Sequence, residues 1–244
     1  MIIDYDVITS KGERPVNEDC VRVIDRGETK VFVLADGLGG QGFGDLASHA
    51  AIDAVEEFMK NNEFDGEFVK NCLACANNGV LKAQEEKEYF DMRTTLVLLV
   101  IHEEKAYWGH VGDSRLYVFS NNKYEYRTPD HSVPQALLNM GEIKEEDIRH
   151  HQDRNRLLRA LGNNNDGGEF VFDIDESDVN ISGRDFLLCS DGFWEWIVEK
   201  DMSKVLKKTS DAHICLKNMS NKVLTDGFGN NMDNFSAILV RCRR

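Results

Sequence analysis

The sequence predicts an α+β protein in which helices cover mostly antiparallel β-sheet. Segments rich in β-branched and aromatic residues occur in groups, and two long helical segments follow one another directly, so strands and helices do not alternate as in a parallel βαβ fold. The chain has 244 residues, 41% of them hydrophobic and 30% charged, and no Pro/Gly/Ser-rich linker divides it. We therefore expect one domain over residues 1–244 with a large core.

Eight short segments have the composition of β-strands. They are residues 21–24, 31–35, 94–101, 106–111, 115–120, 170–174, 186–190 and 235–241. Helical spacing of apolar residues predicts long helices over 46–60, with Asp45 as a candidate N-cap, and over 67–89. Shorter helices are predicted near 193–207 and 213–224. The polar, irregular segment 132–168, with a helical patch at 133–140, is predicted to be a surface insert.

Charge and targeting signals exclude several classes of function. The net charge is −14, which disfavours general binding to nucleic acid or anionic lipid. The N-terminus lacks the basic and apolar regions of a signal peptide, and the most apolar run, 96–101, is far shorter than the ~20 residues of a membrane span. Six cysteines are too sparse for a disulfide framework, and Cys72-x-x-Cys75 lies alone in a helical segment, which favours reduced thiols. We expect a cytoplasmic protein without nucleic-acid or membrane partners.

Acidic residues stand at the ends of the predicted strands. Asp36-Gly37 and Asp191-Gly192 each follow an apolar run, and Asp233 precedes one. A hairpin turn at Asp-Gly would lead into a strand, whereas helical segments follow Asp36 and Asp191. Asp113 lies between two predicted strands, so a hairpin turn explains it equally well.

Carboxylates gathered at one edge of a sheet favour a site for hard cations. Mg²⁺ and Mn²⁺ prefer oxygen ligands, and two such ions about 3.5–4 Å apart can activate a shared water for attack on phosphorus. No His/Cys set has zinc spacing, and His150-His151 are expected to be solvated. A dinucleotide fingerprint at Gly37-x-Gly39-x-x-Gly42 is the weaker alternative, because the acid expected about 20 residues later would fall inside the helical segment.

Seven short blocks resemble, in their order, the metal-dependent protein phosphatase 2C family in its compact bacterial form. They are Arg14-x-x-Asn17-Glu18-Asp19, Asp36-Gly37-x-Gly39-Gly40, Gly112-Asp113-Ser114-Arg115, Asp130-His131-Ser132, Arg159-Ala160-Leu161-Gly162, Ser190-Asp191-Gly192-Phe193-Trp194 and Asp233-Asn234. The resemblance extends over about residues 7–240. It implies a four-layer αββα sandwich of two antiparallel sheets, with the metals at one end of the sheets and 132–168 as a flap beside them.

The resemblance also implies roles for single residues. Two Mn²⁺ or Mg²⁺ ions would be held by Asp36 as the bridge, with the Gly37 carbonyl, Asp191 and Asp233, and by Glu18 through water. Asp19 would act beside these ligands, and Asp113 with Asp191 would form a weaker third metal site. Arg14 would bind the substrate phosphate, a role that suits a bidentate guanidinium; a salt bridge to Glu18 is its structural alternative. Asn234 would orient Asp233.

The implied reaction is hydrolysis of phosphoserine and phosphothreonine in proteins by a water or hydroxide between the metals, without a phosphoenzyme. Leu38 stands where members from higher organisms carry a histidine proposed as the general acid, which leaves the proton donor unidentified. A metal-bound water is our hypothesis for that donor, and we expect His131 to make a structural hydrogen bond. The implied partners are a serine/threonine kinase and its targets, and we expect a monomer. A catalytically silent binding module on the same fold is the alternative function, and it predicts loss of at least one metal carboxylate.

Overall fold

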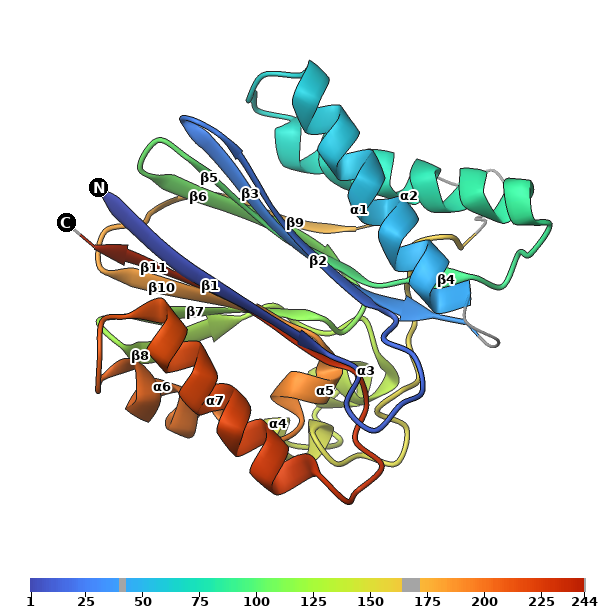
Figure 1. Ribbon diagram of the computed structural model, residues 1–244. Coiled ribbons are helices and arrows are strands. Elements are labelled where there is room, and N and C mark those ends of the chain that lie inside the picture. The colour runs from blue at the N-terminus through green and yellow to red at the C-terminus, as the bar shows by residue number, and fades with distance from the viewer. Residues whose placement is uncertain (40–42, 164–171, 244) are drawn as a thin grey trace.

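The computed structural model describes residues 1–39, 43–163 and 172–243, with the side chains of 175–178 left aside. Two antiparallel sheets face each other and helices cover both outer faces, so the expected αββα sandwich is confirmed (Figure 1). One sheet has the strand order β1-β11-β10-β7-β8, and the other β2-β3-β5-β6-β9 with β4 beside β3.

The first sheet consists of β1 (Ile2–Ser10), β7 (Arg115–Ser120), β8 (Lys123–Arg127), β10 (Arg184–Cys189) and β11 (Phe235–Arg243). The second consists of β2 (Asp19–Arg26), β3 (Thr29–Leu38), β4 (Arg93–Thr94), β5 (Leu96–His102), β6 (Lys105–Val111) and β9 (Asp173–Asn180). The helices are α1 (Phe43–Asn61), α2 (Phe68–Lys87), α3 (Val133–Asn139), α4 (Glu145–Ile148), α5 (Asp191–Trp194), α6 (Glu199–Leu206) and α7 (Ala212–Gly227).

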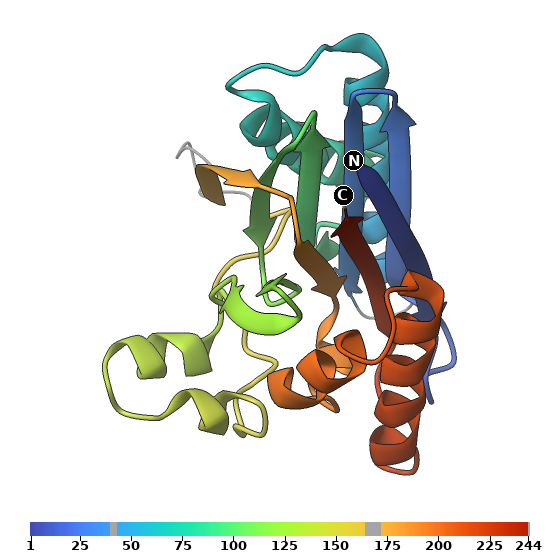
Figure 2. The same ribbon diagram turned by 90° about the vertical axis from the view of Figure 1, so that its left-hand side faces the viewer.

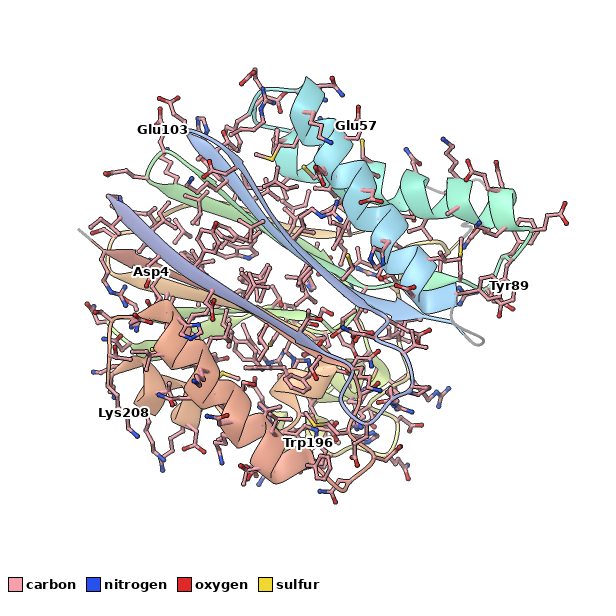
Figure 3. The ribbon with its side chains drawn as sticks, viewed as in Figure 1. Asp4, Glu57, Tyr89, Glu103, Trp196 and Lys208 are labelled. Atoms are coloured by element: carbon pink, nitrogen blue, oxygen red, sulfur yellow. The ribbon has the colours of Figure 1, made fainter. Side chains whose placement is uncertain are left out.

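Apolar side chains form three layers of core (Figure 3). Because successive side chains of a strand point to opposite faces, β3 places Phe32 and Leu34 between the sheets and Val31, Val33 and Ala35 against α1 and α2. In β11, Leu239 likewise faces the layer under α6 and α7. Both faces of the central strands are buried, which explains their continuous apolar runs.

Several predicted boundaries differ from the structure. The strands β1 and β8 were not predicted, since both lie at a sheet edge and lack a continuous apolar run. The strand predicted at 170–174 is β9, Asp173–Asn180, an acid-rich edge strand; residues 170–171 lie outside the described part of the chain. The helix predicted at 193–207 is two helices, α5 and α6. Asp45 lies inside the first turn of α1 rather than at its N-cap.

The connection between β6 and β7 passes from one sheet to the other. Strand β6 pairs with β5 and β9, whereas β7 pairs with β10 and β8, so the hairpin-turn interpretation of Asp113 is wrong. Gly112 has φ of +100°, a conformation that glycine adopts readily and that allows the sharp change of direction. Asp113 is thereby presented at the end of both sheets.

A buried ion pair fixes this connection. Arg115, at the start of β7, donates from Nε and Nη2 to the two carboxylate oxygens of Asp130, both at 2.7 Å. Both side chains are almost fully buried, and the Arg115 guanidinium lies 3.5 Å from the ring centre of Trp194, whose indole donates to the Asp113 carbonyl. The Asp130 block thus holds the Asp113 turn in place.

We predict that Asp130→Ala lowers the free energy of unfolding by about 3–5 kcal/mol, because it leaves the buried Arg115 charge unpaired. Urea denaturation measures the loss. Asp226→Ala is the matched control: Asp226 pairs with Lys222 on the exposed face of α7, and its removal should cost less than about 1 kcal/mol. Equal losses in the two variants would contradict the assignment.

Candidate metal centre

A cleft of about 640 Å³ opens where the two sheets end on the same side. Seven of the predicted site residues line it, and they come from five separate segments of the chain: Arg14, Glu18, Asp36, Gly37, Asp113, Asp191 and Asp233. Leu38 is also in its wall. The eighth predicted residue, Asp19, is buried beneath.

Asp19 joins the two sheets under the cleft. It lies directly opposite Asp36 in the β2–β3 register, and its Oδ2 accepts a hydrogen bond of 2.8 Å from the Ser190 hydroxyl at the end of β10. The same hydroxyl oxygen accepts a hydrogen bond from the Ser236 amide of β11. Asp19 Oδ1 is buried, and among the described residues no donor reaches it.

The backbone around Asp36 is fixed by two threonines. The Asp36 amide donates to the Thr95 hydroxyl (3.0 Å), and the Asp36 carbonyl accepts from the Thr94 hydroxyl and the Thr95 amide (both 2.9 Å). Thr95 lies between β4 and β5, so the strand predicted at 94–101 is two strands in the structure. Asp36 itself lies within β3, which continues to Leu38. The helix α1 begins only at Phe43, so it does not follow Asp36 directly.

Glycines allow close approach on both sides of the cleft. A Cβ on Gly37 would lie 2.1 Å from the Gly44 carbonyl oxygen and 2.7 Å from that of Glu18. A Cβ on Gly192, which follows Asp191 at the start of α5, would lie 2.1 Å from the Asn234 carbonyl oxygen. The Asp-Gly pairs therefore serve packing of backbone against backbone and are not turns of hairpins.

Asn234 fastens the loop that carries Arg14 and Glu18. Its Oδ1 accepts the Glu18 amide (2.8 Å), and its Nδ2 donates to the carbonyl oxygens of Lys11 and Val16 (2.9 Å each). Its backbone amide donates to Asp233 Oδ1 (2.8 Å). Asn234 thus orients Asp233 through its main chain, and its side chain positions the loop.

Arg14 is paired with Asp233 and not with Glu18, the alternative that the sequence left open. Nε and Nη2 each donate to one Asp233 oxygen at 2.9 Å, a bidentate geometry. The Arg14 side chain is 41% exposed at the cleft. This pairing leaves the guanidinium within reach of an anion that binds in the cleft.

The crowded carboxylates favour the protonated state. Burial raises the pKa of Asp36 well above its ordinary range, and the charges of Asp19 and Asp191 raise it further. Burial, with the charge of Asp191, does the same to Asp113. The pKa of Asp191 is raised to about 6 and that of Asp19 to about 7, in both cases mainly by burial. Burial also raises the pKa of Glu18.

The donor set fits divalent cations. Among the described residues, two guanidinium groups contact these carboxylates: Arg14 on Asp233, and Arg154, which lies 3.7 Å from Asp191 and 2.9 Å from Glu195. If all six were ionised, two guanidinium groups would leave four negative charges, as many as two divalent cations neutralise. The six carboxylates are those of Glu18, Asp19, Asp36, Asp113, Asp191 and Asp233. Every side-chain donor is a hard oxygen, as Mg²⁺ and Mn²⁺ prefer.

Sequence reasoning missed Glu195 as a member of the site. It lies one helical turn after Asp191, and burial raises its pKa to about 7. The spacing of four residues was the available signal. The supporting hydroxyl groups of Thr94, Thr95 and Ser190 were also missed, because each contacts backbone or carboxylate partners that are distant in the sequence.

A second group of ligand atoms lies outside the cleft. His110, His131 and Asp173 bring theirs within 4.8 Å of one another. However, His131 Nδ1 accepts the Gly112 amide (3.1 Å), so the ring proton stands on Nε2, the atom that a metal would need. His131 therefore makes the structural hydrogen bond that we expected, to the turn that presents Asp113.

The remaining predictions concern residues outside the cleft. Cys72 and Cys75 are free thiols in α2, the first fully buried. His150 is exposed, and His151 is half-buried, its Nδ1 accepting the Asp153 amide. Gly40 and Gly42, which completed two of the sequence motifs, lie outside the described residues.

Comparisons with known proteins identify the family of the chain. The model of the protein phosphatase 2C family matches residues 11–229. The serine/threonine phosphatase stp of Listeria welshimeri is 34% identical over 209 residues, 82% of this chain and 81% of the relative. The protein phosphatase PhpP of Streptococcus pneumoniae is 26% identical over 246 residues, 98% of this chain and 97% of the relative.

Solved structures share the fold. The serine/threonine phosphatase PstP/Ppp of Mycobacterium tuberculosis superposes with a TM-score of 0.86 at 24% identity, covering all of both chains. The PstP catalytic domain in complex with two manganese ions has a TM-score of 0.81 at 23% identity, covering 98% of this chain and 97% of that one. Within the described residues, every helix is too short or too polar to cross a membrane.

We predict that Asn234→Ala weakens Mn²⁺ binding about 10–100-fold, as loss of groups that orient metal ligands does, because it frees the loop that carries Arg14 and Glu18. Calorimetric titration with Mn²⁺ measures the change. Asn230→Ala is the matched control, since the Asn230 side chain only donates to a carbonyl oxygen at the end of α7. Equal affinities of the two variants would contradict this role of Asn234.

We also predict that, without metal, the free energy of unfolding falls as pH rises between about 4 and 7. In the folded state, Asp191 and Asp19 have pKa values of about 6 and 7, so they keep their protons at pH values where the unfolded chain has lost them. Rising pH therefore favours unfolding. Thermal melting near pH 5 and near pH 8 in chelator measures this. Mn²⁺ should reverse the trend, since it binds the ionised form. If the metal-free protein became more stable as pH rises over this range, the raised pKa values of these buried carboxylates would be contradicted.

Proposed function

Because the chain belongs to the protein phosphatase 2C family, we propose that it hydrolyses phosphoserine and phosphothreonine in proteins with the help of two Mn²⁺ or Mg²⁺ ions. The phosphorylated substrates would be products of a serine/threonine kinase, which the enzyme would oppose. The single observation that carries this proposal is one cleft that holds the five carboxylates Glu18, Asp36, Asp113, Asp191 and Asp233 together with Arg14.

The carboxylates divide the work of holding the ions. Asp36 is central, since the charges of Asp19, Asp191, Asp113 and Asp233 all act on it, and this position suits a bridge between two ions. The Gly37 carbonyl, Asp191 and Asp233 would complete one ion's protein ligands. Glu18 would hold the second ion through water. When bound, two such ions supply the positive charge that lowers the pKa of a water and offsets the charge of the phosphate.

Asp113 and Asp191 would provide the weaker third metal site. Their charges act directly on one another, since Asp191 raises the pKa of Asp113. Asp19 is buried beneath the cleft and would orient and charge-balance the ligands rather than bind metal. The hydrogen bond that Asp19 accepts from Ser190 at the end of β10 supports this division of roles.

Arg14 would bind the phosphate of the substrate. Cations that take Asp233 would free the guanidinium, whose fork matches two phosphate oxygens and would stabilise the charge that they carry in the transition state. Leu38 lines the cleft and offers no proton, so the leaving serine or threonine oxygen would receive its proton from water.

The wider setting of the enzyme is part of the proposal. We infer one catalytic domain over residues 1–244, with 132–168 as a flap; Figure 2 shows α3 and α4, in yellow-green, projecting away from the two sheets. A cytoplasmic monomer that acts on phosphorylated proteins is consistent with the acidic composition. The alternative of a silent binding module predicts a missing carboxylate, and each predicted carboxylate is at the cleft or beneath it.

We predict that the protein releases phosphate from a phosphothreonine peptide with Mn²⁺ and not with chelator. Asp191→Asn should lower kcat/KM at least about 1000-fold, since it removes a ligand, and Arg14→Gln about 10–100-fold, since it removes a phosphate contact. Asp226→Asn, on the outer face of α7, is the matched control and should leave activity unchanged.

Two outcomes would contradict the proposed function. One is hydrolysis that persists in chelator or in Asp191→Asn. The other is no hydrolysis by the wild type although calorimetry shows that it binds Mn²⁺, which would leave the binding module as the better account.

A further inference from the structure

A second hollow, of about 420 Å³, continues from the catalytic cleft. The two share four lining residues: Leu38, Gly39, Asn155 and Leu157. Beyond these, the second hollow is lined by three arginines, Arg93, Arg156 and Arg159, and by one acid, Asp91. We call it the basic hollow. In a chain of net charge −14, its charged lining has an excess of two positive charges.

The β-sheet fixes the distance between the basic hollow and the metal centre. Arg93 on β4 is paired directly with Leu38, two residues beyond Asp36 on β3. Two residues along a strand are about 7 Å and the neighbouring strand is about 5 Å away, so the Cα atoms of Arg93 and Asp36 lie roughly 8 Å apart. Leu161 forms a β-bridge with Thr94, and Arg159, two residues before Leu161, lines the same hollow as Arg93.

The three guanidinium groups are available to a ligand. Arg93 lies 3.8 Å from Asp91, Arg156 3.3 Å from Asp153, and Arg159 3.2 Å from Asp173. The arginine side chains are 43–69% exposed in these pairs. Exposed pairs of this kind contribute little to stability, so a phosphate or carboxylate that offers two oxygens can replace them.

Other basic residues of the segment 132–168 are not available in this way. Arg149 donates to Glu199 (2.8 Å), and Arg154 is engaged by Glu195 (2.9 Å). Lys144 lies beside Glu146 and is not in the wall of either hollow. Of these basic residues, Arg156 is therefore distinguished by its place in the wall of the basic hollow.

We propose that the basic hollow binds a second anionic side chain of the substrate, a phosphate or a carboxylate, close in sequence to the residue that is dephosphorylated. An extended peptide advances about 3.3–3.6 Å per residue, so the hollow corresponds to a position roughly two to four residues away. This inference rests on the proposed phosphatase function and names the class of substrate that the enzyme prefers: a segment phosphorylated twice, or phosphorylated beside acidic residues.

The test compares peptides that differ at one position. Each carries one phosphothreonine to be hydrolysed, and glutamine, glutamate or phosphoserine is placed in turn at each of the four positions on either side. The wild type should hydrolyse the best anionic peptide with kcat/KM about tenfold above its glutamine counterpart, mainly through KM, because the arginines contact ground state and transition state alike. The preference should shrink at high salt.

Variants then locate the preference. Arg93→Gln with Arg156→Gln should reduce it to less than about twofold and leave kcat/KM for the glutamine peptide unchanged. Lys82→Gln with Lys217→Gln is the matched control, with the same change in net charge on exposed positions of α2 and α7. Arg159→Gln is made separately, since Arg159 also contacts Asp173 beside His131. Melting temperatures show whether each variant is folded.

The outcomes separate the inference from the proposed function. A preference for phosphoserine alone identifies a second phosphate as the ligand, and an equal preference for glutamate identifies a general anion site. Equal hydrolysis of all peptides by the wild type, or a preference that survives in the double arginine variant, overturns the inference and leaves the phosphatase function in place. Failure to hydrolyse any peptide in the presence of Mn²⁺ overturns both.

Discussion

Carboxylates that repel one another are held together at the place where the two sheets end. Asp36 comes from one sheet, Asp191 follows a strand of the other, and Asp233 precedes a third strand, so the charges meet only when both sheets pack. Much of the surrounding structure resists this repulsion: the threonine hydroxyl groups fix Asp36, and Asn234 ties down the loop of Glu18. The folded protein therefore carries electrostatic repulsion between carboxylates at this end of the sheets, and bound cations would reduce it.

The same arrangement explains why the site is joined to its surroundings by backbone contacts. Gly37 and Gly192 place main chains in direct contact, where a side chain would force them apart. The buried pair of Arg115 and Asp130 holds the turn that presents Asp113, and Trp194 links that turn to the helix that begins at Asp191. The positions of the cleft residues are therefore set by packing of the core.

Sequence reasoning found the fold class and the cleft carboxylates. Strand composition and acids at strand ends are local signals, and the order of the family motifs along the chain connects the separate acids to one site. It could not find contacts between distant segments. The pairing of Arg14 with Asp233, the passage of β6–β7 between sheets and the place of Glu195 beside Arg154 depend on tertiary packing. The edge strands β1 and β8 were missed because exposure weakens their apolar pattern.

The central claim is that the carboxylates of the cleft assemble a centre for two metal ions. Anomalous diffraction at the manganese edge, from crystals grown with Mn²⁺, tests it most directly. The account predicts two strong peaks in the cleft, both in contact with Asp36, one also with Asp191 and Asp233 and the other toward Glu18. Peaks only outside the cleft, or a cleft in which Arg14 keeps Asp233 and no manganese is found, would contradict it.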